Sequence, residues 1–307
     1  MKLVHITTCT NRKRVTASSS LLGRTLPCGE MNDVAGEWMS RVAKSSSEHV
    51  VHSLYCGRGF SASLSASQLA CTDLWVISAG LGLILSSEKV PSYSLTIASG
   101  TEDCIKDKII SDFDPSRWWS AVNTISGRSL SKLINDDSGE SLFLISLSQP
   151  YATLVIKDLM NCTPDSFKRI RIVGLMPSVI LPEHIRTVCM PYDNRINDPT
   201  CLPGAMTDFA QRTAYHFVKY IWNVSGFQSA IDDSDAVLNI MNRLEAPIVP
   251  RRIQLSDVEI RNLIVANWNR AEGLSSRMLR VLRDDLNVAC EQHRFSIIFK
   301  QVKEEIN

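Results

Sequence analysis

The sequence predicts an α/β protein: a mostly parallel sheet covered by helices on both faces, followed by a small helical module at the C-terminus. The first observation is a repeated alternation of short apolar, β-branched runs with segments of helical periodicity, which is typical of parallel sheets. The second is a late capping box followed by an arginine-bearing amphipathic segment. The third is an ordinary globular composition, with 44% hydrophobic and 21% charged residues among 307.

Composition also limits the function. Lys and Arg number 33 against 32 Asp and Glu, so no overall charge indicates a polyanionic partner. The nine cysteines show no zinc-binding spacing, and we expect reduced thiols in a cytoplasmic protein with neither a metal nor another cofactor. The longest apolar stretch, 74–85, is shorter than a bilayer requires, so no membrane partner is expected.

Strands are expected where apolar β-branched residues lie between turn residues, and helices where apolar residues recur every three or four positions. Together these elements indicate one α/β domain over residues 1–230. The expected strands cover 2–7, 50–54, 73–78, 141–147, 169–174 and 186–190, and the expected helices cover 37–42, 61–69, 116–126, 152–160 and 206–224.

The composition changes after residue 230. Acidic residues, a helix-like segment at 236–244 and two prolines make 231–252 an expected linker. Residues 253–307 then begin with a capping box formed by Ser256 and Glu259, which predicts a helix to about residue 268. A Gly-containing turn and a second helix from Ser275 give the outline of a helix-turn-helix or winged-helix module.

Three arginines mark the second helix of this module. Its apolar residues point inward, so Arg277, Arg280 and Arg283 are expected to point outward and to contact DNA or RNA phosphates. A solvated charged face and a surface that docks another protein are the alternatives.

A cationic loop follows the first expected strand and contains Cys9, Asn11 and Lys13. Because the carboxyl ends of parallel strands frame the ligand crevice of such sheets, this loop can hold an anion or a polar ring. A solvated surface loop is the alternative.

Tyr55 and Gly57 follow the second expected strand and precede a Ser-rich helix. The glycine permits close backbone approach, and the free amides of the helix can receive a phosphate or carboxylate. The chain has neither a P-loop nor a G-x-G-x-x-G pattern, which disfavours nucleoside triphosphatases and ordinary dinucleotide dehydrogenases.

Small residues follow the third expected strand, namely Ser78, Ala79, Gly80 and Gly82. They allow a ligand to occupy the strand end, and Tyr93 can then stack on a planar ligand. A tight turn packed against a neighbouring helix is the alternative. Three such strand ends together predict one pocket at the edge of the sheet.

Two carboxylates are the candidates for chemistry. Asp193 follows the last expected strand and is the first choice for a general base or a ribose-binding group, and Asp73 is the second candidate acid. An ordinary turn residue is the alternative for Asp193. No complete set of nucleophile, base and orienting residue is visible, so the sequence does not establish an enzyme.

Three motifs in this region carry a resemblance. They are C-x-x-x-K from Cys9, L-Y-C-G-x-x-F from Leu54, and S-A-G-x-G-L-I from Ser78 with P-x-Y from Pro91. Over residues 1–100 the chain resembles the core of the YaaA-like family, which includes bacterial peroxide-stress proteins. It is more distantly similar to the accessory domain of archaeosine tRNA-guanine transglycosylases.

The resemblance implies a Rossmann-like α/β domain with a cationic cleft, and a base pocket of uracil-glycosylase-like shape. The first hypothesis is therefore a protein that binds a nucleobase or nucleotide and acts on its glycosidic bond, as a glycosidase or transglycosylase does. The second is a non-enzymatic DNA- or RNA-binding protein in stress response or phage defence. The third is a subunit whose C-terminal module docks a protein partner. The sequence departs from the family after about residue 110.

Overall fold

The computed structural model describes residues 1–248 and 251–306, and the chain divides into two units, Met1–Ala246 and Pro247–Asn307. The two units are described separately. In the first unit, the predicted α/β class and the mostly parallel sheet are confirmed.

The sheet of the first unit has five strands in the order β4-β3-β1-β6-β7. The central strand β1 (Lys2–Thr8) pairs in parallel with β3 (Leu74–Ser78) and with β6 (Ser141–Ser146). β6 pairs in parallel with β7 (Ile170–Val173), and β4 (Gly82–Leu85) runs antiparallel to β3. Four strands therefore end at the same edge of the sheet.

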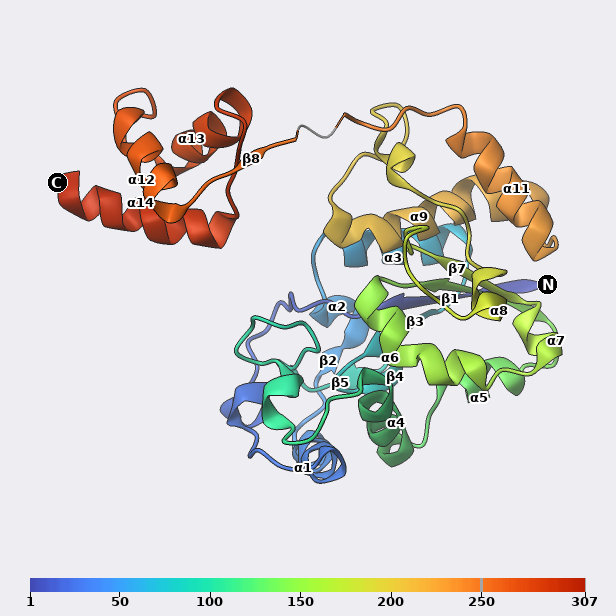
Figure 1. The fold of residues 1–307 in the computed structure, drawn as a ribbon. Coiled ribbons are helices and arrows are strands. Elements are labelled where there is room, and N and C mark those ends of the chain that lie inside the picture. Colours follow the sequence, from blue (N-terminus) through green and yellow to red (C-terminus); the bar gives the residue numbers. More distant parts are fainter. Residues whose placement is uncertain (249–250, 307) are drawn as a thin grey trace. The chain divides into compact units, whose positions relative to one another are not determined.

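Helices cover both faces of this sheet (Figure 1). α3 (Arg58–Leu69) and α9 (Phe209–Phe217) pack together on one face. α4 (Pro115–Ser126) and α6 (Gln149–Met160) pack together on the other face, where α1 (Met31–Lys44) lies against α4. The other strands and α-helices of this unit are β2 (His49–Val50), α2 (Val51–Leu54), β5 (Lys89–Val90), α5 (Leu130–Asn135), α7 (Pro164–Phe167), α8 (Glu183–Arg186), α10 (Asn223–Ser225) and α11 (Ala230–Met241).

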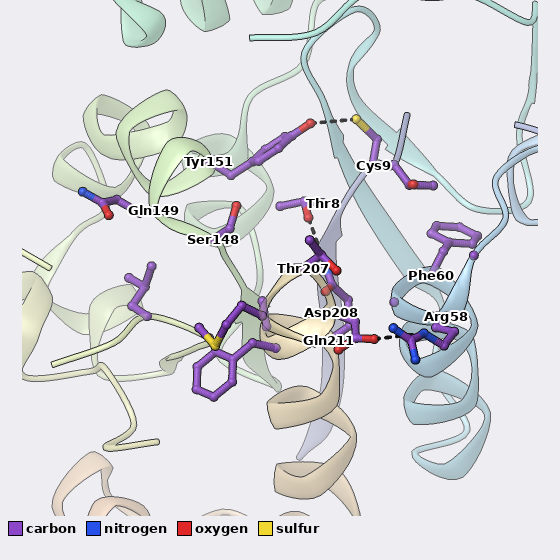
Figure 2. Close-up of a pocket in the computed structure, with 18 of the residues that line it drawn as sticks. Thr8, Cys9, Arg58, Phe60, Ser148, Gln149, Tyr151, Thr207, Asp208 and Gln211 are labelled. Carbon is purple, nitrogen blue, oxygen red and sulfur yellow. Dashed lines mark hydrogen bonds and ion pairs between the residues drawn. The ribbon is translucent and has the colours of Figure 1, made fainter. Parts of the chain in front are cut away.

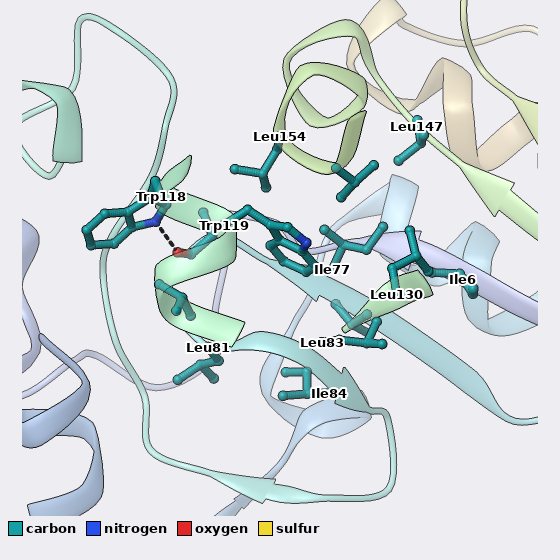
Figure 3. Packing of buried hydrophobic residues seen from close by; sticks show 14 of the residues in the cluster. Ile6, Ile77, Leu81, Leu83, Ile84, Trp118, Trp119, Leu130, Leu147 and Leu154 are labelled. Carbon is teal, nitrogen blue, oxygen red and sulfur yellow. Dashed lines mark hydrogen bonds between the residues drawn. The ribbon is translucent and has the colours of Figure 1, made fainter. Parts of the chain in front are cut away.

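The sheet separates two apolar clusters, because successive side chains of a strand point to opposite faces. On β6, Phe143 and Ile145 belong to the cluster under α4 and α6, part of which is drawn in Figure 3. Their neighbours Leu142 and Leu144 belong to the cluster under α9 and α11. In register, Leu144 lies opposite His5 of β1. Burial on both faces explains the continuous apolar sequence of this strand.

Two of the predicted strands are wrong. Within 50–54, only His49–Val50 pairs, with β5, and Val51–Leu54 forms the short helix α2. Within 186–190 there is one isolated bridge between Cys189 and Ile172. Both segments are rich in the apolar and β-branched residues that are typical of strands. Neither forms enough backbone hydrogen bonds to a neighbouring strand to be one, and the residue composition of a segment does not show whether a neighbouring strand is available.

The predicted domain boundary also differs from the structure. Helix α11 starts at Ala230, earlier than expected, because the Ser229 side chain accepts from the amide of Asp232. Its residues Val237 and Met241 are completely buried in the first unit, which extends to residue 246. Most of the expected linker 231–252 is therefore part of the first unit. Residues 249–250 of that linker lie outside the described residues.

The second unit contains α12 (Asp257–Ala266), α13 (Ser275–Arg280) and α14 (Gln292–Ile306). A π-helical turn, Val281–Asp285, continues α13. The predicted capping box is confirmed, since the Ser256 hydroxyl accepts from the Glu259 amide while the Glu259 carboxylate accepts from the Ser256 amide. β8 (Ile253–Gln254) and β9 (Val288–Ala289) form a short parallel pair, and the core contains Ile260, Ile264, Met278, Leu282, Phe295, Ile298 and Phe299.

Candidate functional site

A cavity of about 540 Å³ opens at the carboxyl ends of β1, β6 and β7 (Figure 2). Thr8 ends β1, Ser148 follows β6 and Gly174 follows β7, and all three residues line the cavity. β1 is followed in the sheet order by β3 on one side, and β6 is followed by β7 on the other side, so the strand order reverses between β1 and β6. The cavity therefore lies at a topological switch point, where ligands of open α/β sheets bind.

Two helices begin at this cavity. Gly57 precedes α3 with φ 103°, a conformation that favours glycine, and Ser148 precedes α6. Neither residue caps its helix through a side chain. Within the described residues, the free first-turn amides of the two helices therefore have no side-chain acceptor, with Pro150 of α6 contributing no N–H, and the helix dipoles favour negative charge at this point.

Polar contacts to β1 fix the position of α3. Nδ1 of His5 lies 2.9 Å from Oγ of Ser67, and Oγ1 of Thr7 lies 2.7 Å from Oγ of Ser63. All four side chains are buried. Burial also lowers the pKa of His5 to about 3, so this imidazole is neutral near pH 7. These contacts orient α3 so that its N-terminus meets the cavity.

The first turn of α9 supplies the buried polar groups of the cavity. Gln211 is 8% exposed, and its Nε2 donates to Oγ1 of Thr8 over 3.1 Å, while its Oε1 has no partner among the described residues. Asp208 lines the same cavity and pairs with Nε of Arg212 at 2.8 Å and with Nε of Arg58 at 3.4 Å. Figure 2 shows Asp208 and Gln211 close to Arg58 of α3.

A thiol and a phenol meet at the cavity. The Sγ atom of Cys9 lies 3.0 Å from Oη of Tyr151, and both residues line the cavity (Figure 2). Burial raises the pKa of Tyr151 well above the usual range of a phenol, so this hydroxyl keeps its proton. Among the residues that line the cavity, Arg12 and Arg58 carry positive charge against one carboxylate, Asp208. The cavity thus offers cations, free amides and hydroxyl groups to a ligand.

Four of the predicted ligand-binding residues form a second cluster, in which Tyr55, Ser78 and Tyr93 are buried and Lys13 is half-buried. Oη of Tyr93 lies 2.7 Å from Oη of Tyr55 and 2.5 Å from Oγ of Ser78. Nζ of Lys13 lies 4.1 Å from the centroid of the Tyr93 ring. Burial raises the pKa of both tyrosines and lowers the pKa of Lys13. The structure brings these four residues together, but they are not among those that line the cavity.

The protein's own side chains surround the small residues after β3, which corrects the expectation that a ligand occupies this space. The Trp118 indole donates to the carbonyl of Ala79 over 2.8 Å (Figure 3), and the Trp38 indole donates to the carbonyl of Gly80 over 2.6 Å. A Cβ atom at Gly80 would lie 2.6 Å from the ring of Tyr93. The small side chains of Ala79 and Gly80 thus leave room for aromatic rings of the core.

The other predicted ligand-binding residues divide between the cavity and its surroundings. Cys9 and Gly57 line the cavity, whereas Asn11 is exposed and does not line it. Gly82 begins β4 with φ 73°, and a Cβ atom there would lie 2.7 Å from Oδ1 of Asn123. Backbone geometry and close packing therefore account for Gly82.

Neither predicted catalytic carboxylate lines the cavity. Asp73 precedes β3 and lies with Lys2 at the amino ends of the strands, which is the opposite edge of the sheet. Asp193 accepts from the backbone amide of Arg195 over 2.9 Å and pairs with its guanidinium, which holds the pKa of Asp193 below its usual range. This is the turn geometry that we gave as the alternative for Asp193.

The three predicted nucleic-acid-binding arginines have different surroundings. Arg277 is exposed and pairs with Glu272. Arg280 is exposed and forms no ion pair or hydrogen bond within the described residues. Arg283 does not point outward as expected: it is half-buried, and its Nε and Nη2 donate to the carbonyl of Cys290 over 3.1 and 2.7 Å.

Sequence reasoning missed Asp208, Gln211 and Arg58. Polar residues at the start of the predicted helix 206–224 gave no signal, because such residues are common at helix starts. Their partners, such as Thr8, are about 200 residues away in sequence, so the pattern alone could not identify the site.

Comparison with protein-family models, curated proteins and solved structures found no match for this chain. Within residues 1–248 and 251–306, no helix combines the length and apolar character that a bilayer crossing requires. In the same residues, no group of three or more His, Cys, Asp or Glu side chains is arranged to hold a metal ion.

Proposed function

We propose that this protein binds a nucleobase, nucleoside or nucleotide in the strand-end cavity and acts on that ligand, or on a nucleic acid that carries it. The observation that carries the proposal is Oε1 of the buried Gln211, which has no hydrogen-bond partner within the described residues. A buried polar atom without a partner costs free energy, so a ligand that donates a hydrogen bond to it gains affinity. Nucleobase edges present such N–H donors next to acceptors.

The groups around Gln211 complement the rest of such a ligand. The hydroxyl of Thr8 accepts from Gln211 and keeps its own proton to donate to a ring nitrogen or carbonyl. The free amides of α3 and α6, with Arg12 and Arg58, suit a phosphate or another anionic group. A nucleotide combines both kinds of group in one molecule.

A glycosidase- or transglycosylase-like reaction is the chemistry that we propose for this site. Cleavage of a glycosidic bond needs a carboxylate near the positive charge that develops on the sugar, and a proton donor for the leaving group. Asp208 is the carboxylate among the lining residues, and the hydroxyl of Tyr151 is a donor that keeps its proton. A role in stress response or phage defence is part of this proposal, and the resemblance to peroxide-stress proteins supports the stress-response role.

A second candidate function is nucleic-acid binding without chemistry through a helix-turn-helix-like arrangement in the second unit. The exposed Arg280, on a helix that follows α12 across a short turn, favours it. Docking of a protein partner remains the alternative for this unit. Loss of DNA binding in Arg280→Gln would support nucleic-acid contact, and unchanged binding would favour the protein partner.

The test of the cavity measures ligand binding by calorimetry with free bases, nucleosides, nucleoside monophosphates and inorganic phosphate. Gln211→Leu should weaken binding of the best ligand about tenfold, which corresponds to about 1.4 kcal/mol, with an unchanged melting temperature. The control is Gln68→Leu, an exposed site at the amino edge of the sheet, which should bind as the parent does. Absence of binding to the whole panel, or equal affinity of parent and Gln211→Leu, would contradict the proposal.

A further inference from the structure

Three arginines from separate segments meet in the second unit. A groove of about 760 Å³ beside the β8–β9 pair is lined by Arg252, Arg283 and Arg294. One acidic residue, Glu291, lies among the lining residues. Guanidinium groups therefore outnumber carboxylates among the residues that line the groove. Its remaining lining residues are Gln254, Leu255, Ala289 and Cys290.

Each of these guanidinium groups is fixed by contacts within the unit. Nε of Arg252 donates to the carbonyl of Arg283 over 3.0 Å, and Nε and Nη2 of Arg283 donate to the carbonyl of Cys290. Nε of Arg294 donates to Asp257 over 2.6 Å, and its Nη2 donates to the carbonyl of Leu255 over 2.8 Å.

The same contacts leave donors unused. In all three arginines, Nη1 donates to no group within the described residues, so two N–H donors of each side chain remain available. Because the side chains are already held in place, a ligand would order them at little entropic cost.

The charges are only partly compensated. Arg252 pairs with Asp284 and Arg294 pairs with Asp257, but Arg283 bonds to a carbonyl oxygen and has no carboxylate partner within the described residues. The Glu291 carboxylate accepts from two backbone amides at the start of α14, and these contacts lower its pKa. Three carboxylates thus face three guanidinium groups, and within the described residues it is the unused Nη1 donors, with the unpaired Arg283, that can receive an anion.

We propose that this groove binds phosphates of a nucleic-acid backbone through Arg252, Arg283 and Arg294. The free Nη1 of each guanidinium group can donate a charge-assisted hydrogen bond to a phosphate oxygen, which is stronger than a bond between neutral groups. Three cations along a groove larger than one phosphate favour a polymer over a free phosphate ion. Arg283, which the sequence placed on one face with Arg277 and Arg280, belongs to this different surface. This site is independent of the strand-end cavity.

The test uses the full chain and measures the anisotropy of labelled duplex DNA and structured RNA at several salt concentrations. Arg252→Gln and Arg294→Gln should each weaken binding about three- to tenfold and should reduce the salt slope by about one unit per lost phosphate contact. Arg261→Gln is the matched control, because Arg261 pairs with Glu305 much as Arg294 pairs with Asp257, but does not line the groove. This variant should keep the parent's salt slope.

Two further arms separate the alternatives. Arg252→Lys and Arg294→Lys keep the charge but lose the fixed Nη1 donor, so their affinities should lie between those of the parent and the glutamine variants. The melting temperature of each variant shows whether it folds. If the variants at one of the two positions, Arg252 or Arg294, do not fold, the variants at the other position test the proposal. The proposal is overturned if the parent binds neither nucleic acid at 50 mM salt, if Arg261→Gln loses as much affinity as Arg294→Gln, or if only an acidic peptide binds.

Discussion

Arg171 and Asp233 form a fully buried ion pair, in which Nε of Arg171 lies 2.6 Å from Oδ2 of Asp233. Arg171 belongs to the edge strand β7, and Asp233 lies in the first turn of α11. The other donors of Arg171 reach the backbone carbonyls of Lys168, Ile170 and Gln228. The pair thus joins the sheet to a helix that the sequence predicted as part of a linker.

Asp233→Ala should destabilise the first unit by about 3–5 kcal/mol, because it leaves the Arg171 charge buried without a partner. Urea unfolding measures this loss. The double variant Arg171→Met/Asp233→Leu should recover most of the stability, since apolar residues of similar volume often replace a buried pair without cost. A loss below about 1 kcal/mol for Asp233→Ala would contradict a buried pair that joins β7 to α11.

The unfolding free energy should fall as the pH decreases from about 6.5 to about 4. Burial lowers the pKa of His5 to about 3 and that of His216 to about 4, against 6.5 in the unfolded chain. The unfolded state therefore binds more protons in this range, and acid favours unfolding. Each histidine contributes up to about 1.4 kcal/mol per pH unit. Urea unfolding at several pH values measures this slope.

The histidine contribution can be isolated by substitution. His216→Asn should reduce the slope between pH 6 and 4.5 by about 1.4 kcal/mol per pH unit, because one titrating group is removed. The exposed His293 provides the control, and His293→Asn should leave the slope unchanged. Carboxylates with lowered pKa, such as Asp114 at about 2, affect stability mainly at lower pH. An unchanged slope in His216→Asn would contradict a buried, neutral His216.

Gly80→Val should destabilise the fold without a separate effect on binding in the cavity. The new side chain would collide with the ring of Tyr93, and overpacking of this kind costs about 1–3 kcal/mol. Gly36→Ala is the control, because Gly36 lies inside α1 with open space around it and should gain up to about 1 kcal/mol. Calorimetric melting and ligand titration measure both effects. Weaker ligand binding at an unchanged melting temperature would restore the original expectation of a ligand at Gly80.

The sequence predicted the fold class because periodicity is local information. The runs at 2–7 and 141–147 became β1 and β6, and the capping box at Ser256 starts α12. Strand pairing is not local, so 186–190 was wrongly predicted as a strand. The antiparallel β4 was missed because small residues such as those around Gly80 are typical both of hairpin turns and of ligand-binding loops.

The candidate site was predicted in part for the same reason. The rule that strand carboxyl ends meet at one edge led to Cys9 and Gly57, which line the cavity. It could not distinguish a tyrosine that faces a ligand from one that fills the core, as Tyr93 does. Gln211 comes from a helix far away in sequence, and its contact with Thr8 depends on how α9 packs.

Arg212 should control the wall of the cavity that residues 206–211 form. This side chain is 8% exposed and donates to Asp208, to Asn197 over 2.9 Å and to the carbonyl of Ala205 over 3.0 Å. Arg212→Met removes these bonds and leaves several acceptors without a donor, so we expect a loss of about 3 kcal/mol. Amide hydrogen exchange over residues 197–208 should become faster, and ligand binding should weaken.

Two further variants test whether the fixed guanidinium causes this effect. Arg212→Lys keeps the charge but cannot reach the same acceptors at once, so it should resemble Arg212→Met rather than the parent. Arg195→Met removes a more exposed arginine that pairs with Asp193, and should cost less than about 1 kcal/mol and leave exchange over residues 197–208 unchanged. Full rescue by Arg212→Lys would show that charge alone holds this segment. Unchanged exchange in Arg212→Met would show that the segment is held by other contacts.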